Sequence, residues 1–147
     1  MVPLRALLLA PFMLAISAAA PPSREVVIGS QTGQCTLLVI ANRTATPECG
    51  GKLVTLTYGK QAVSIVFTAQ DGRLLSFRGV MAAKGSGQDI LKVQRITTVT
   101  SKPSPAIVKS AGGTCMITAF SPTRDRIECS AKSPGKQYAG QFITSGT

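Results

Sequence analysis

The sequence contains no histidine and no tryptophan, and only six of its residues are acidic. The absence of histidine excludes Ser-His-Asp and Cys-His catalysis and every metal site that uses a histidine ligand. Beyond the N-terminal segment, no apolar run approaches the length of about 18 residues that a membrane-spanning helix needs. We therefore expect no transmembrane segment in the mature chain.

What the 147-residue chain does contain is largely apolar and basic. Hydrophobic residues make up 44% of it, and 16 Lys and Arg residues stand against six Asp and Glu residues. A chain of this length fits a single domain, and its hydrophobic content argues against intrinsic disorder.

The N-terminal segment has the three-part layout of a secretory signal peptide. One positive charge at Arg5 is followed by an apolar stretch and then by small residues. Cleavage after Ala19 is favoured over a cut one residue later, which would place Pro21 next to the scissile bond. We therefore expect residues 1–19 to be removed and the protein to be exported, to the periplasm or outside the cell.

The four cysteines form two groups with the same internal spacing, Cys35 with Cys49 and Cys115 with Cys129. An even cysteine number in an exported protein indicates disulfides, and the equal spacing favours pairing within each group. A metal site built from four thiolates usually has close Cys-x-x-Cys pairs, which this chain lacks, so we expect no metal. Closing a loop of about 15 residues is worth about 3 kcal/mol in the chain-entropy model.

The second cysteine group predicts a β-hairpin. Apolar residues follow Cys115, a Ser-Pro-Thr turn comes next, and a strand returns to Cys129. Pairing the two cysteines across the hairpin places Ile117 opposite Ile127 on the same face.

The first cysteine group is expected to repeat this plan over residues 35–49, around an Ala-Asn-Arg turn. Gly33 and Gly113 each stand two positions before the first cysteine of their group. The similarity indicates either a weak internal duplication, over about 33–70 and 113–147, or convergent hairpin chemistry, and both interpretations stay open.

Residues 53–80 predict three antiparallel strands, joined by a two-residue turn at 59–60 and a three-residue loop at 70–72 with a left-handed glycine. The longer second loop is selected because a two-residue loop would place Arg78 opposite Ile65. The expected inner face carries Val54, Leu56, Tyr58, Val63, Ile65, Phe67, Leu75 and Phe77. The expected outer face carries Thr55, Thr57, Ser64, Thr68, Ser76 and Arg78.

The rest of the chain predicts further strands and connections. We expect strands over 25–30, 89–99 and 136–144 and loops over 84–88 and 101–105. The apolar phase changes between Val93 and Ile96, which predicts a bulge near Arg95. No window of the mature chain has helical periodicity. Eight or nine short strands with frequent turns predict an all-β fold, an antiparallel sandwich or small barrel.

Candidate catalytic groups are few. Glu48 and Glu128 each precede the second cysteine of their group, and glycosidases use a pair of carboxylates. The simpler interpretation is an outward polar residue beside an inward cysteine. The Gly-Ser-Gly stretch at 85–87 lacks the strand-to-helix setting of a phosphate-binding loop. We therefore expect no catalytic residues, no cofactor and no enzymatic activity.

Positive charge is the one functional feature of the sequence. The predicted mature chain, 20–147, loses Arg5 and keeps 15 basic and six acidic residues, a net charge of +9. Such an excess attracts anions, and it also promotes solubility. The basic residues expected near hairpin tips and strand ends form the candidate anion site: Arg43, Lys60, Arg73, Arg124, Arg126, Lys132 and Lys136.

These observations favour a non-enzymatic binding domain for an anionic lipid, a polysaccharide, another polyanion of the envelope or an acidic protein. Nucleic acid is disfavoured because the mature chain keeps only six aromatic residues, half of which are assigned to the core. The alternative is a periplasmic inhibitor or envelope-structural protein that docks on another protein through a sheet edge or a disulfide hairpin. Polyanion binding would weaken steeply with salt, whereas a shape-complementary protein interface would change little.

Overall fold

The computed structural model of the protein describes residues 26–83, 87–100 and 105–146. The expected signal peptide, 1–19, lies outside these residues. So do residues 84–86 and 101–104 of the two expected loops.

The described residues form nine β-strands and one short 3-10 helix, η1, with no α-helix among them. In chain order the elements are β1 (Val26–Ile40), β2 (Arg43–Thr44), η1 (Thr46–Glu48), β3 (Cys49–Tyr58), β4 (Ala62–Ala69), β5 (Leu74–Ala83), β6 (Gln88–Val99), β7 (Ile107–Ser121), β8 (Arg124–Ser133) and β9 (Lys136–Thr144). The predicted all-β class is confirmed.

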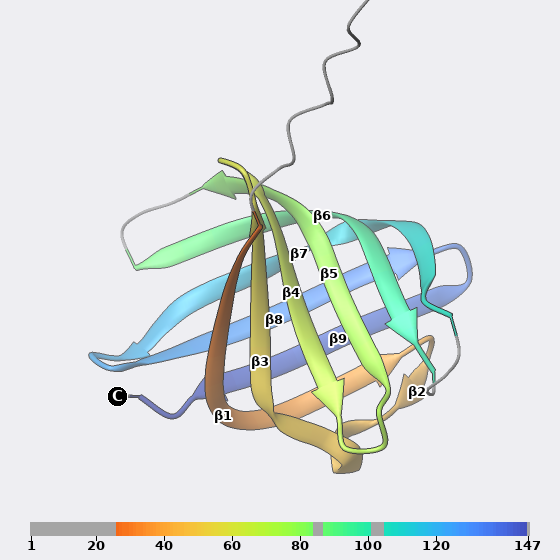
Figure 1. The fold of residues 1–147 in the computed structure, drawn as a ribbon, viewed down its shortest axis with the longest axis horizontal. Helices are drawn as coiled ribbons and strands as arrows, with labels where there is room; N and C mark the ends of the chain where they lie inside the picture. Colours follow the sequence, from red (N-terminus) through yellow and green to blue (C-terminus); the bar gives the residue numbers. More distant parts are fainter. Residues whose placement is uncertain (1–25, 84–86, 101–104, 147) are drawn as a thin grey trace, which may run out of the picture.

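The strands form one antiparallel sheet that closes on itself. Its order is β2-β1-β3-β4-β5-β6-β7-β8-β9, and β9 pairs again with β1. The long β1 makes the closure, because residues 26–32 pair with β3 and residues 33–39 pair with β9. The result is an eight-stranded barrel with β2 as an extra strand, which confirms the barrel form of the prediction. In Figure 1, β3, β4 and β5 cross in front of β7, β8 and β9, so the barrel has two layers.

Side chains from every long strand fill the barrel. The largest buried ones are Tyr138, Phe67, Phe77, Phe142, Leu38, Leu53, Ile65, Leu75, Leu91, Ile96 and Cys115. The rings of Phe67 and Phe77 meet edge to face, with their centroids 5.9 Å apart. Phe67 also packs over Gly140, where a side chain would overlap the ring. The interior of the barrel is therefore a packed core.

The predicted β7–β8 hairpin is confirmed, as is its disulfide. Cys115 lies opposite Cys129, and Ile117 lies opposite Ile127. All four side chains belong to the core cluster or pack against it.

The β4–β5 hairpin also has the predicted register, with Phe67 opposite Leu75. Residues 70–72 form the three-residue loop, and Gly72 has the expected positive φ of 85°. The hydrophobic pattern selects this loop correctly.

The predicted register of β3 against β4 is wrong by one residue. Residues 59–61, rather than 59–60, form the turn, and Leu53 lies opposite Phe67. Leu53, Thr55 and Thr57 therefore face inward, whereas Val54, Leu56 and Tyr58 face outward. The hydrophobic pattern favours the second set for the interior because it is the more apolar of the two. The closed interior next to Phe67 instead accommodates Leu53 and two small threonines.

The predicted bulge in β6 is confirmed. The pairing register shifts between Val93 and Arg95, which leaves Gln94 as the extra residue. Beyond the bulge Ile96 returns to the core opposite Phe77.

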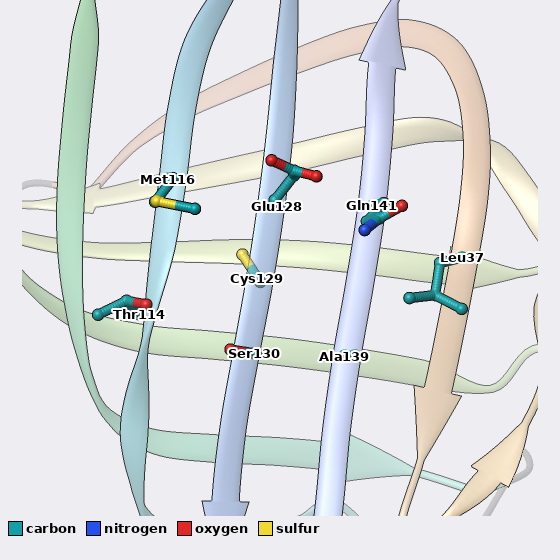
Figure 2. Close-up of a pocket in the computed structure, with 8 residues that line it drawn as sticks. All are labelled: Leu37, Thr114, Met116, Glu128, Cys129, Ser130, Ala139 and Gln141. Atoms are coloured by element: carbon teal, nitrogen blue, oxygen red, sulfur yellow. The ribbon is translucent and has the colours of Figure 1, made fainter.

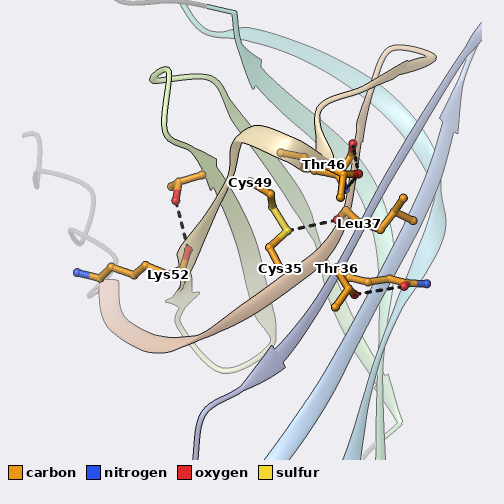
Figure 3. The surroundings of a disulfide bond; sticks show 9 residues. Cys35, Thr36, Leu37, Thr46, Cys49 and Lys52 are labelled. Atoms are coloured by element: carbon orange, nitrogen blue, oxygen red, sulfur yellow. Dashed lines mark hydrogen bonds between the residues drawn. A yellow bond between two sulfur atoms is a disulfide. The ribbon is translucent and has the colours of Figure 1, made fainter.

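The Cys35–Cys49 disulfide is confirmed, but its setting is not the predicted hairpin (Figure 3). The β1–β3 ladder ends at Thr32 and Lys52, and Cys35 already pairs with Phe142 of β9. The disulfide therefore joins β1 to β3 just beyond the point where the two strands part.

The segment between these cysteines folds back on β1. Both residues of the 41–42 turn have positive φ, and a short β1–β2 pairing follows. The backbone N–H of Leu38 donates to Thr46 Oγ1 at 3.0 Å, and Ala45 N–H donates to the Leu38 carbonyl at 2.7 Å (Figure 3 shows the Thr46 contact). Helix η1 stands where a returning strand was predicted, because Pro47 has no N–H to donate to a ladder.

Candidate anion-binding surface

The structure places the seven predicted anion-binding residues at two ends of the barrel. We call the end that carries the β1–β2, β4–β5 and β8–β9 turns the β2 end. This end holds Arg43, Arg73, Lys132 and Lys136, whereas the opposite end holds Lys60, Arg124 and Arg126. The seven residues therefore do not converge on one site.

Arg73 is committed to ion pairs. Its Nε donates to Asp71 Oδ2 at 2.7 Å, and its Nη2 lies 3.5 Å from Glu48 Oε2. The Arg73 backbone N–H also donates to Asp71 Oδ1, which holds the pKa of Asp71 below its ordinary value of 3.8. Arg73 thus ties the β4–β5 turn to η1, and its charge is already compensated.

Arg43, Lys132 and Lys136 lie around a junction of two turns. Asn42 accepts the backbone N–H of Gln137 through Oδ1 at 2.6 Å and donates through Nδ2 to the Gly135 carbonyl at 3.0 Å. This junction brings the β1–β2 and β8–β9 turns together. The three cations form a basic group at the β2 end.

Arg124 and Arg126 share one aromatic ring. Their guanidinium carbons lie 5.0 and 4.8 Å from the centroid of Phe120, which is 43% exposed. Glu128 borders the same shallow hollow of about 190 Å³. The carboxylate offsets part of the positive charge at this end of the barrel.

A second hollow lies on the outer side of β7, β8, β9 and β1 (Figure 2). Its volume is about 280 Å³, and it is lined by Leu37, Thr114, Met116, Glu128, Cys129, Ser130, Ala139 and Gln141. Its one charged lining side chain is an acid, so the hollow disfavours anions.

Three basic residues that sequence analysis did not select lie together on the outside of β5 and β6. We call Arg78, Lys92 and Arg95 the basic face. Arg78 lies directly opposite Arg95, and Lys92 lies opposite Val80. A hollow of about 280 Å³ lies beside the two arginines, lined by Ala62, Arg78, Gly79, Val80, Gln94 and Arg95.

Tyr58 holds Arg78 in place. The guanidinium carbon of Arg78 lies 4.3 Å from the centroid of the Tyr58 ring. A cation–π contact of this kind is worth about 0.5–1 kcal/mol at an exposed site. It forms because the β3–β4 register turns Tyr58 outward.

Among the described residues, the strands that carry and flank the basic face place no acidic side chain beside it. Strands β3, β4 and β5 contain no Asp or Glu, and the one acid of β6, Asp89, lies opposite Ile117 on the inward side. Within the described ranges both salt bridges belong to Arg73. Arg78, Lys92 and Arg95 therefore have no salt-bridge partner among the residues that the structure describes.

The sequence contained part of the signal for this surface. Arg78 was correctly expected on the outer face, and the β6 bulge was expected near Arg95. The missing information was the register of β5 against β6, which depends on the length of the loop between them.

No family model, curated protein or solved structure matches the chain. Across the residues that the structure describes, no group of three or more His, Cys, Asp or Glu could hold a metal ion. No helix in the same part of the chain has the length and apolar character needed to cross a membrane. Surface geometry and charge are therefore the features from which a function can be inferred.

Proposed function

We propose that this chain is an exported, non-enzymatic domain that binds an anionic component of the cell envelope through the basic face. The observation that carries the proposal is the pairing of the Arg78 and Arg95 positions across β5 and β6, with Lys92 also on β6 and no salt bridge to these three residues in the described part of the chain. The two disulfides support export, because disulfides persist in oxidising compartments outside the cytoplasm.

An anion would relieve a repulsion that is built into the sheet. Like charges directly opposite each other destabilise a β-ladder. A phosphate, sulfate or carboxylate on this surface would accept charge-assisted hydrogen bonds from the arginines of the basic face. The adjoining hollow of about 280 Å³ leaves room for such a group.

The residues around this hollow support binding rather than catalysis. Its charged side chains are arginines, and none of its lining residues is a usual nucleophile or general base. The two carboxylates considered from the sequence are apart: Glu48 in η1 pairs with Arg73, and Glu128 lies on the outside of β8.

Retention on immobilised heparin tests the proposal. R78Q/R95Q should elute at clearly lower salt than the wild type, and the slope of log K against log salt should fall by about 2, one for each lost charge. K132Q/K136Q removes the same charge from the β2 end and is the matched control. Equal elution of R78Q/R95Q and the wild type, or a larger effect in the control, would show that the basic face is not the binding surface.

An open sheet edge favours a second candidate, docking on another protein. Residues 26–31 of β1 pair only with β3 in the described part of the chain, so a partner strand could add to their other edge. Such binding would change little with salt. Recovery of one stoichiometric protein from an envelope extract at high salt would favour this candidate over the first.

A further inference from the structure

Exposed apolar side chains continue the outer surface beyond the basic face. Ile28 is 70% exposed and Val26 is 45% exposed. Val26 lies opposite Tyr58, and Ile28 lies opposite Leu56. Tyr58 and Leu56 point outward because of the β3–β4 register. We call Val26, Ile28, Leu56 and Tyr58 the apolar strip.

The apolar strip and the basic face both lie on the outer side of the sheet, and Arg78 lies nearest to the strip. A single row of paired positions crosses five neighbouring strands through Ile28, Leu56, Ser64, Arg78 and Arg95. Adjacent strands are about 4.8 Å apart, so the backbones of Ile28 and Arg78 are separated by about 14 Å. In Figure 1 the strands β1, β3, β4 and β5, which carry the row from Ile28 to Arg78, lie side by side in the front layer.

Tyr58 connects the two features. It belongs to the apolar strip, and the Arg78 guanidinium stacks on its ring at 4.3 Å. An amphipathic ring between aliphatic residues and cations is the arrangement found where a protein surface meets the boundary between lipid headgroups and acyl chains.

We infer that this surface docks on an anionic lipid membrane. The basic face contacts lipid phosphates, and the apolar strip enters the boundary between headgroups and acyl chains. The inference rests on the proposed function and identifies its ligand as anionic lipid. A membrane satisfies both halves of the surface, because it supplies negative charge and an apolar phase within a few ångströms of each other.

Other occupants fit less of the surface. A second copy of the chain in a two-fold contact would present the same surface to this one, and the strands that carry it, β1, β3, β4, β5 and the outer side of β6, offer no carboxylate to pair with the arginines. An acidic polysaccharide would pair with the arginines but offers no apolar phase to cover Ile28.

Vesicle sedimentation tests the inference. The purified protein is mixed with vesicles of phosphatidylcholine alone and with vesicles that also contain phosphatidylglycerol. We expect binding to the anionic vesicles, and a loss of about tenfold or more in the V26S/I28S partition coefficient. Elution of V26S/I28S from heparin should remain that of the wild type. I107S/V108S replaces two other exposed aliphatic residues, 46% and 59% exposed on β7, and should leave both readouts unchanged.

The outcomes separate the two proposals. If V26S/I28S sediments with anionic vesicles like the wild type, or if the wild type is retained on heparin but binds no vesicles, the lipid inference is wrong and the proposed function stands. If R78Q/R95Q elutes from heparin like the wild type, the proposed function itself is wrong. Circular dichroism of each variant verifies that it is folded, which the exposure of the replaced side chains leads us to expect.

Discussion

At the scale of single residues, two glycines mark places where neighbouring backbone leaves no room for a side chain. A Cβ atom at Gly113 would overlap the carbonyl oxygen of Ser130. One at Gly33 would overlap the carbonyl oxygen of Ile143. Each glycine lies two positions before a cysteine of β1 or β7. The absence of a side chain lets the long strands approach β8 and β9 closely.

We therefore expect Gly113→Ala to destabilise the fold by about 1–3 kcal/mol, the usual cost of inserting a methyl group into a packed site. Gly112→Ala is the matched control, because a Cβ there meets no atom within 4 Å, and it should change stability by less than about 0.5 kcal/mol. Urea unfolding followed by circular dichroism measures both. Equal stability of the two variants would contradict the close-approach argument.

Asp71 makes stability sensitive to acid. Its pKa is lowered in the folded protein, chiefly by the hydrogen bond from the backbone N–H of Arg73 and further by the Arg73 side chain. A lowered folded pKa means that the stabilisation is fully present above the ordinary carboxyl pKa of 3.8 and is lost as pH falls through the folded value. We expect wild-type stability to fall more steeply below about pH 4 than that of Asp71→Asn, as measured by urea unfolding over a pH series. Parallel profiles would show that this carboxylate does not contribute.

At the scale of elements, the two disulfides close loops of equal length in different surroundings. Both have a sequence separation of 14, so chain entropy assigns each about 3 kcal/mol. Cys115 and Cys129 are almost fully buried, within the β7–β8 ladder. Cys35 and Cys49 are partly exposed, where β1 and β3 separate.

A reductant should therefore open Cys35–Cys49 first under native conditions, because thiol–disulfide exchange requires access to a sulfur atom. Limited reduction, alkylation and peptide mapping measure the order. We expect alkylated Cys35 and Cys49 to accumulate while Cys115 and Cys129 remain linked. Simultaneous release of all four thiols would show that reduction follows global unfolding instead.

The residues of each turn determined whether the register of the two strands that it joins could be predicted from the sequence. In β4–β5 the Asp-Gly dipeptide predicts a turn, and only the three-residue loop keeps Arg78 off the apolar face. The predicted pairing of Phe67 with Leu75 is confirmed. In β3–β4 a two-residue and a three-residue turn are both compatible with Gly59. Only packing against Phe67 selects Leu53 for the interior.

At the scale of the whole molecule, the strand order decides where the basic residues lie. The antiparallel meander sends successive turns to alternate ends, so Arg43 and Lys60 lie at different ends although both were predicted at hairpin tips. Arg78 and Arg95 occupy paired positions in the middle of the β5–β6 ladder because of the register of these two neighbouring strands. Surface charge thus follows from topology and register rather than from position along the chain.

The sequence by itself determined the all-β class, both disulfides, the β6 bulge and two of the hairpin registers, because each depends on alternation, turn residues or cysteine spacing over a short stretch of chain. Tertiary structure alone decided three other features: the inward face of β3, the closure of β1 on β9 and the pairing of the Arg78 and Arg95 positions. These depend on space inside a closed barrel and on pairings between residues as distant as Gly33 and Thr144. No local pattern encodes such pairings, since a slip of one residue preserves the alternation while exchanging the two faces.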